Sequence, residues 1–208
     1  MTHRPPRSRP VVLLHGWTMR GSIFDDLVSR LPDELECHAP DLPGHGALAS
    51  VAPSLKTAAE TLADLLQSHD LEDVLLVGWS MGAAVSWQYI EQFGSDRIAG
   101  LMTADMSPKL ACDSNWPFGL IGQSQADVDA STARMERDWR GMSEAIATTM
   151  FGRPGGAPGY DRQTALAQIL ANDPDKMVTM WKALVDMDHR DLIPRLPCPL
   201  LATCGALS

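Results

Sequence analysis

The segment GWSMG at residues 78–82 places a serine, Ser80, between two glycines. The apolar run VLLV before it predicts a buried strand, and the segment after it predicts a helix that ends at Gly94. At such a turn the hydroxyl stands above the sheet edge, and the amide of Met81 points from the helix N-terminus at whatever the serine attacks. Glycine is expected on both sides because a Cβ there would clash with the neighbouring strand and helix. The pattern predicts a nucleophilic serine; the alternative interpretation is a glycine-rich turn with an incidental serine.

A serine nucleophile needs a base, an acid that orients the base, and donors for the oxyanion. One donor is the amide of Met81. The second is expected in the loop HGWTM, which follows the first apolar run and should lie beside the turn at Ser80, and the amide of Trp17 is our candidate. His15 in the same loop is expected to brace the loop rather than to transfer protons.

The elements that must position these groups alternate along the chain. Apolar, strand-like segments and amphipathic, helix-like segments follow one another, which is typical of a parallel sheet with helices on both faces. The expected strands lie within residues 11–17, 34–46, 74–77 and 98–108, and the expected helices at 22–31, 54–70, with Ser54 as N-cap, and after Ser80. The alternation stops after Pro108. We therefore expect a core in residues 1–108, a helical lid in 109–185, and a return to the sheet in 186–208.

Composition narrows the class of protein. The chain has 208 residues, 45% hydrophobic and 21% charged, as in a soluble protein of one domain or one domain with an insertion. The formal net charge of −9 disfavours nucleic acid and anionic membranes as partners. The four cysteines show no metal-binding spacing, and no signal peptide or membrane span is evident. We expect no metal, no cofactor, a cytoplasmic location, and a monomer or weak dimer.

Three segments together resemble one superfamily. VVLLHGW, APDLPGHG and VGWSMG are similar to motifs of the α/β hydrolases, and within them to the small carboxylesterases that include the pimeloyl-carrier-protein methyl ester esterases. The likeness runs from about residue 11 to residue 205. It implies an α/β-hydrolase fold, nucleophilic Ser80, oxyanion donors Trp17 and Met81, and a lid over an acyl pocket. The implied substrate is a small-molecule or acyl-carrier ester, with the substrate-contacting candidates His15, His45, Trp79 and Trp116.

Two groups of the family's triad depart from its pattern. The acid usually follows the strand that LLATCG represents, but Ser208 stands where the aspartate is expected. Asp105, at the end of the preceding strand, is the candidate acid, and a loop-capping aspartate is the alternative. None of the six histidines follows a last strand. We expect the base beyond Ser208, together with a further strand and helix.

Other functions remain compatible with these residues. One alternative is a protein of this fold that binds an apolar ligand in the lid pocket without turnover, although such a binder needs neither the serine turn nor the oxyanion loop. A cofactor-free haloperoxidase or a carbon–carbon bond hydrolase would use the same triad. Most of the aromatic and methionine side chains in 109–185 are expected to pack the lid onto the sheet, and a few to line an adaptable apolar pocket.

Overall fold

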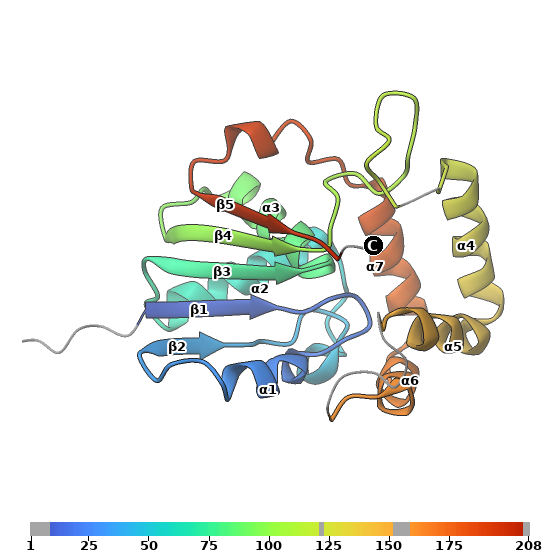
Figure 1. The fold of residues 1–208 in the computed structure, drawn as a ribbon, viewed down its shortest axis with the longest axis horizontal. Helices are drawn as coiled ribbons and strands as arrows, with labels where there is room; N and C mark the ends of the chain where they lie inside the picture. The colour runs from blue at the N-terminus through green and yellow to red at the C-terminus, as the bar shows by residue number, and fades with distance from the viewer. Residues whose placement is uncertain (1–8, 121–122, 152–158, 206–208) are drawn as a thin grey trace, which may run out of the picture.

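A parallel sheet of five strands forms the centre of the protein. The computed structural model describes residues 9–120, 123–151 and 159–205. Every pair of neighbouring strands in the sheet is parallel. The spatial order is β2-β1-β3-β4-β5, and Figure 1 shows all strands pointing the same way. The strands are β1 (Arg9–Leu14), β2 (Leu35–His38), β3 (Val74–Trp79), β4 (Ile98–Ala104) and β5 (Leu200–Thr203).

The order of the strands defines one special position at the sheet edge. β1 has β2 on one side and β3 on the other, so the direction of winding reverses between β1 and β3. In open parallel sheets, ligands bind outside the carboxyl ends of the strands at such a reversal. The register pairs Leu14 with Gly78, which brings the loop after β1 beside the turn after β3. The fold therefore places the two predicted parts of the oxyanion site next to each other.

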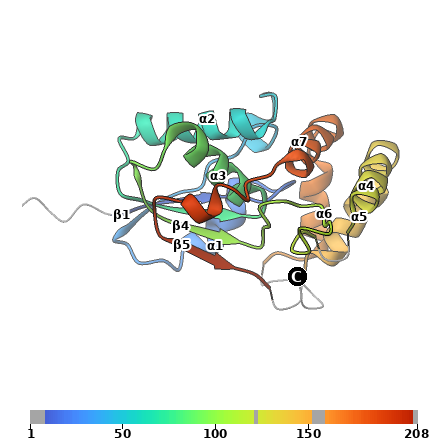
Figure 2. The ribbon, with the colours of Figure 1, turned by 90° about the horizontal axis from the view of Figure 1, so that it is seen from above.

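Two long helices cover one face of the sheet. α2 (Leu55–Ser68) and α3 (Met81–Phe93) pack against each other on this face, as Figure 2 shows from above. Both helices contribute buried side chains to the largest apolar cluster. The expected N-cap of α2 is confirmed, since Ser54 Oγ accepts a hydrogen bond from the Thr57 amide at 2.9 Å. The expected end of α3 is also confirmed, because Gly94 follows it with φ 78°.

The other face is covered by shorter helical turns. η1 (Gly21–Phe24) and α1 (Asp25–Val28) pack by way of Phe24 on the side chains of Val11 and Leu13. The helix expected over 22–31 is thus shorter than predicted. Its residues Asp25–Val28 bury no side chain, and Leu27 is 44% exposed, so a longer helix would gain little apolar contact.

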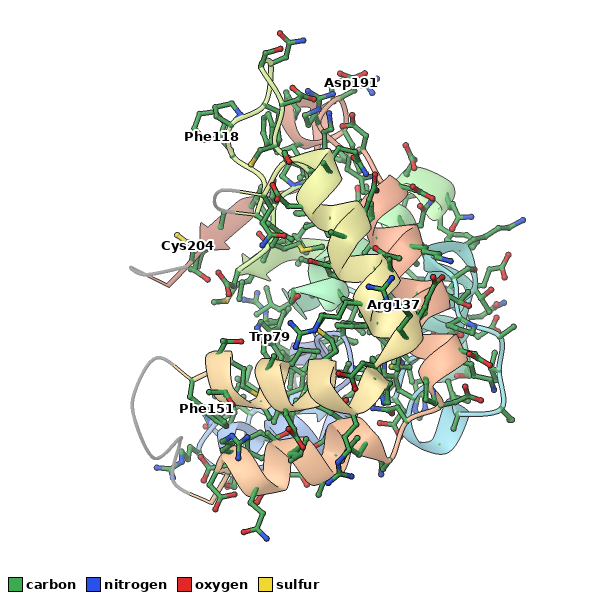
Figure 3. The ribbon with its side chains drawn as sticks, turned by 90° about the vertical axis from the view of Figure 1, so that its right-hand side faces the viewer. Trp79, Phe118, Arg137, Phe151, Asp191 and Cys204 are labelled. Carbon is green, nitrogen blue, oxygen red and sulfur yellow. The ribbon has the colours of Figure 1, made fainter. Side chains whose placement is uncertain are left out.

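Four helices lie beyond the carboxyl ends of the strands, and we call them the cap helices (Figure 1). They are α4 (Gln125–Arg137), α5 (Trp139–Thr149), α6 (Arg162–Leu170) and α7 (Pro174–Asp186). α5 packs on α6 and α4 on α7, and the Trp181 indole N–H of α7 donates to Thr132 Oγ1 of α4 at 2.8 Å. Figure 3 looks onto these helices from outside. This is the segment that the sequence predicted to be helical.

The chain then returns to the sheet edge through η3 (Ile193–Arg195), while the short η2 (Gly46–Leu48) lies in the loop after β2. In the described part of the chain, β5 pairs with β4 alone, and Leu200 and Leu201 are 37% and 58% exposed. The further strand and helix that the resemblance implies were expected beyond Ser208. That expectation therefore lies outside the described residues. No helix within residues 9–120, 123–151 and 159–205 has the length and apolar character needed to cross a membrane.

Candidate active site

Ser80 occupies a strained turn between β3 and α3. Its backbone has φ 51° and ψ −116°, a combination that L-residues rarely adopt. Its amide donates to the Ala104 carbonyl of the neighbouring β4 at 2.8 Å, which helps to hold the turn. Strained, non-glycine backbone of this kind persists where the surrounding structure imposes it and is concentrated at functional sites.

The two glycines around Ser80 are required by close backbone approach. A Cβ on Gly78 would lie 2.5 Å from the Ala83 nitrogen at the start of α3. A Cβ on Gly82 would lie 2.1 Å from the Leu14 carbonyl oxygen of β1. Both distances are far below van der Waals contact, and in both cases the obstacle is main chain. The steric reason that the sequence suggested for the spacing is therefore present in the structure.

The loop after β1 forms a tight turn beside Ser80. The Met19 amide donates to the Gly16 carbonyl at 3.1 Å, so residues 16–19 make a four-residue turn with Trp17 and Thr18 at its centre. On the other side, Met81 is the first residue of α3, and its amide has no acceptor within the helix. Two main-chain donors thus belong to adjacent segments at the carboxyl end of the sheet.

The Trp17 side chain extends into the cap helices. Its indole N–H donates to the Met177 carbonyl of α7 at 3.0 Å. Its ring centroid lies 6.0 Å from that of Trp139 in α5 and 5.3 Å from that of Trp181 in α7. The residue whose amide is the candidate oxyanion donor is therefore anchored by the cap.

Two further hydrogen bonds join the same loop to the cap helices. Asn172, between α6 and α7, donates through Nδ2 to the Thr18 carbonyl at 2.9 Å, and the Tyr160 hydroxyl contacts Met19 Sδ at 3.2 Å. Sequence reasoning missed these contacts. The partners are separated by 154 and 141 positions, and no local pattern signals a contact over such a distance.

Asp105 follows β4 directly and shares two features with Ser80. Its backbone is also left-handed, with φ 56°. Its amide donates to the Thr203 carbonyl of β5 at 2.8 Å, as the Ser80 amide does to Ala104 of β4. The Asp105 side chain is exposed, and its carboxylate makes no hydrogen bond to any residue that the structure describes. Among the described residues, no hydrogen bond of the carboxylate supports the loop-capping role that was the alternative.

His15 is held inside the protein by its own loop. It is fully buried, its Nδ1 lies 2.9 Å from the Gly16 carbonyl, and its Nε2 accepts from the Leu42 amide at 3.0 Å. Nε2 is thus the unprotonated nitrogen of a neutral ring. Burial, with a contribution from neighbouring His45, lowers the pKa of His15 to about 3. This placement matches the bracing role that the sequence suggested.

His45 packs against His15 with ring centroids 5.0 Å apart. It is fully buried, its Nδ1 lies 3.0 Å from the Pro43 carbonyl, and burial lowers its pKa. His189 is buried against Trp87, and burial lowers its pKa as well. Within residues 9–120, 123–151 and 159–205, no histidine hydrogen-bonds to Ser80 or Asp105.

The two predicted substrate-contacting tryptophans occupy different places. Trp79 lies against the loop after β1, since a Cβ on Gly16 would be 3.2 Å from its ring, and it also packs against the cap cluster around Met19. Figure 3 shows Trp79 behind the cap helices. The Trp116 indole N–H donates to Ser107 Oγ and to the Lys109 carbonyl, both at 3.1 Å, which braces the loop after β4. Direct contact of either ring with a substrate stays a prediction. The described residues contain no group of three or more His, Cys, Asp or Glu side chains arranged to hold a metal.

Comparison with known proteins places nearly all of the chain in one family. A model of the alpha/beta hydrolase family matches residues 11–206. The chain is 30% identical over 201 residues to a pimeloyl-[acyl-carrier protein] methyl ester esterase of Vibrio vulnificus, covering 95% of this chain and 75% of the relative. It is also 30% identical over 200 residues to the protein of that name in Chromobacterium violaceum, covering 94% and 74%.

Solved structures agree on the fold. An esterase from Exiguobacterium antarcticum superposes with a TM-score of 0.83 at 24% identity, covering 93% of this chain and 72% of that protein. A bromoperoxidase from Bacillus anthracis superposes with a TM-score of 0.86 at 23% identity, covering 95% and 74%. Because these two likenesses combine different activities with low identity, they establish the architecture and do not separate the chemistries.

Proposed function

Because this chain belongs to the α/β hydrolase family and is a carboxylic ester hydrolase, we propose that Ser80 is the nucleophile that its substrate acylates. The observation that carries the proposal is the Ser80 backbone, held at φ 51° between β3 and α3. A strained residue at a strand-to-helix turn presents its hydroxyl outward and places helix amides beside it. A protein that only binds an apolar ligand needs no such strain.

The oxyanion hole in this proposal has one donor from each of two adjacent segments. Ser80 Oγ attacks the ester carbonyl carbon, and the carbonyl oxygen gains negative charge. The amides of Met81 and Trp17 stabilise that charge, which is a larger effect in the transition state than in the bound ester. The base passes the Ser80 proton to the departing alcohol as the acyl-enzyme forms. Water then attacks the acyl-enzyme with the help of the same base, which releases the acid and restores the Ser80 hydroxyl. The helix dipole of α3 adds to the stabilisation.

We assign the orienting acid to Asp105. Its support is the shared geometry with Ser80: each residue follows the end of a strand, each has positive φ, and the two strands are neighbours. The Asp105 carboxylate is exposed and has no hydrogen-bond partner in the described part of the chain. It is therefore available to accept a hydrogen bond from an N–H group of the base. In this scheme Asp105 holds the base in the tautomer that accepts the Ser80 proton.

The cap helices form the lid of the proposed site. We assign residues 109–185 to the lid, and 1–108 with 186–208 to the hydrolase core. Apolar side chains of the lid pack against the loop after β1, in a cluster that includes Trp139, Ile146, Met150 and Phe151. In this proposal these side chains supply the apolar contacts that an acyl chain requires. The names of the relatives support an ester of an acyl chain attached to a carrier protein as the substrate class.

The test compares the Ser80→Ala and Ser86→Ala variants in two assays. The first measures the rate of hydrolysis of p-nitrophenyl butyrate, and the second detects labelling by a fluorophosphonate from the mass of the intact protein. Ser86 lies on the same helix, but its hydroxyl donates to the Gly82 carbonyl at 2.8 Å. Ser80→Ala should lower kcat by about 10³-fold or more and abolish labelling, because the nucleophile and its base act as a unit. Ser86→Ala should retain both. Substantial hydrolysis by folded Ser80→Ala protein would reject the nucleophile.

A further inference from the structure

Thr18 adopts a backbone conformation that does not suit its side chain. It is the third residue of the turn formed by residues 16–19, and its φ is 67°. A positive φ at this position favours glycine or asparagine, and for a β-branched residue it is strained. Thr18 is also fully buried, and its hydroxyl has no hydrogen-bond partner among the described residues. Contacts from outside the turn must therefore maintain this conformation.

The side chain of Asn172 supplies such a contact from the cap helices. Its Nδ2 donates to the Thr18 carbonyl at 2.9 Å, a bond with buried partners. The same nitrogen lies 3.2 Å from the carbonyl oxygens of Gln168 and Ile169 at the end of α6. Asn172 is only 7% exposed, so the amide is fixed between α6 and the turn.

We propose that Asn172 is a positioning residue for the oxyanion hole: it holds Thr18 in its strained conformation and thereby sets the direction of the Trp17 amide. This inference rests on the proposed roles of Ser80 and Trp17. The Trp17 N–H and the Gly16 carbonyl belong to one planar peptide, and that carbonyl accepts the hydrogen bond from the Met19 amide at 3.1 Å. Rotation of Thr18 toward negative φ turns the peptide that carries the Met19 amide, so it breaks this bond and releases the peptide that carries the Trp17 N–H. The indole bond from Trp17 to the Met177 carbonyl restrains the side chain, not the amide.

The expected kinetic effect is specific. The oxyanion donor acts mainly on the charge that develops in the transition state, whereas the ester is bound mainly by the apolar lid. Loss of the Asn172 bond should therefore lower kcat and leave KM nearly unchanged. A displacement of about 1 Å at a catalytic group can cost about 10²-fold in rate, so we expect a loss of about 10- to 100-fold.

A double-mutant cycle with Thr18 separates positioning from general stabilisation. Asn172→Leu keeps the number and branching of the side-chain heavy atoms and removes the donor. Thr18→Gly removes the conformational strain, because glycine adopts positive φ freely. In the Thr18 background, Asn172→Leu should lower kcat on p-nitrophenyl butyrate by about 10- to 100-fold. In the Thr18→Gly background the same substitution should lower it by about 3-fold or less.

Each rate is divided by the amount of protein that a fluorophosphonate labels when the labelling reaction is complete. This division corrects the rate for unfolded protein. Gln163→Leu, on the exposed side of α6, is the matched control and should leave kcat unchanged. An equal loss of kcat in both Thr18 backgrounds would show that Asn172 only stabilises the end of α6, and would overturn the inference. So would a raised KM at unchanged kcat. Hydrolysis that survives in Ser80→Ala would instead reject the proposed function on which the inference rests.

Discussion

Gly82→Ala tests whether the turn at Ser80 depends on contact between α3 and β1. The new Cβ would lie 2.1 Å from the Leu14 carbonyl oxygen, 2.6 Å from the Leu14 carbonyl carbon and 2.8 Å from Leu14 Cβ. The first distance is about 1.3 Å short of the 3.4 Å at which ordinary contact begins. The obstacle includes main chain of a central strand, so it cannot rotate away as a side chain can.

The cost follows from the movement that the clash demands. Either α3 must retreat from β1 by about 1 Å, or the sheet must deform, and a gap of that size forfeits about a quarter to a half of each dispersion contact across it. Overpacking that side chains can partly absorb costs about 1 to 3 kcal/mol. We therefore expect Gly82→Ala to lower the free energy of unfolding by about 3 kcal/mol or more. Any folded fraction should also lose ester hydrolysis, because Ser80 moves with α3.

Urea denaturation followed by far-UV circular dichroism measures this loss, with Gly100→Ala as the matched control. Gly100 lies in β4, and a Cβ there would meet Leu75 Cδ2 at 3.6 Å and the Pro199 carbonyl oxygen at 3.8 Å, which are ordinary contacts. The control should change stability by less than about 1 kcal/mol, in the stabilising direction, since glycine is unfavourable in a strand. A Gly82→Ala protein as stable as the control would refute the steric explanation of the turn.

Two other predictions concern titratable groups. Asp105→Asn should leave the fold intact and lower kcat by about 10²- to 10⁴-fold, because the amide does not stabilise a charged base or select its tautomer; a near-normal kcat would move the acid elsewhere. His15 should make the protein less stable in acid, because its folded pKa of about 3 lies below the unfolded value near 6.5. Its stabilising contribution is complete above pH 6.5 and is lost as the pH falls toward 3, by about 3 kcal/mol at a pH of about 4.5. Urea midpoints at pH 7 and pH 4.5 measure the loss, and a His15→Gln variant with the same acid sensitivity as the parent protein would contradict it.

The sequence by itself determined the architecture and the place of the turn at Ser80. Strand and helix patterning is local, so the parallel sheet, α2 with its Ser54 cap and the end of α3 at Gly94 follow from short segments. The glycines at 78 and 82 carried information because close backbone approach restricts residue type directly. The position of Ser80 at a strand-to-helix turn could therefore be predicted from a short sequence segment. The helix expected over 22–31 was shorter in the structure because its length depended on what its apolar side could contact.

Only the tertiary structure decided how the rest of the site is held. The Trp17 indole bond to Met177 and the Asn172 bond to Thr18 join positions 160 and 154 residues apart, and their geometry arises from the packing of the cap helices onto the sheet. The positive φ of Thr18 was equally hidden, because threonine gives no sign of a left-handed turn. Only the structure shows that His15 is fully buried with both ring nitrogens at hydrogen-bond distance from main-chain atoms, and its contact with a substrate stays a prediction. Close backbone contact restricts the residue type at a position, so it can be read from the sequence. Contacts between side chains that are distant in sequence form only when the cap helices pack on the sheet.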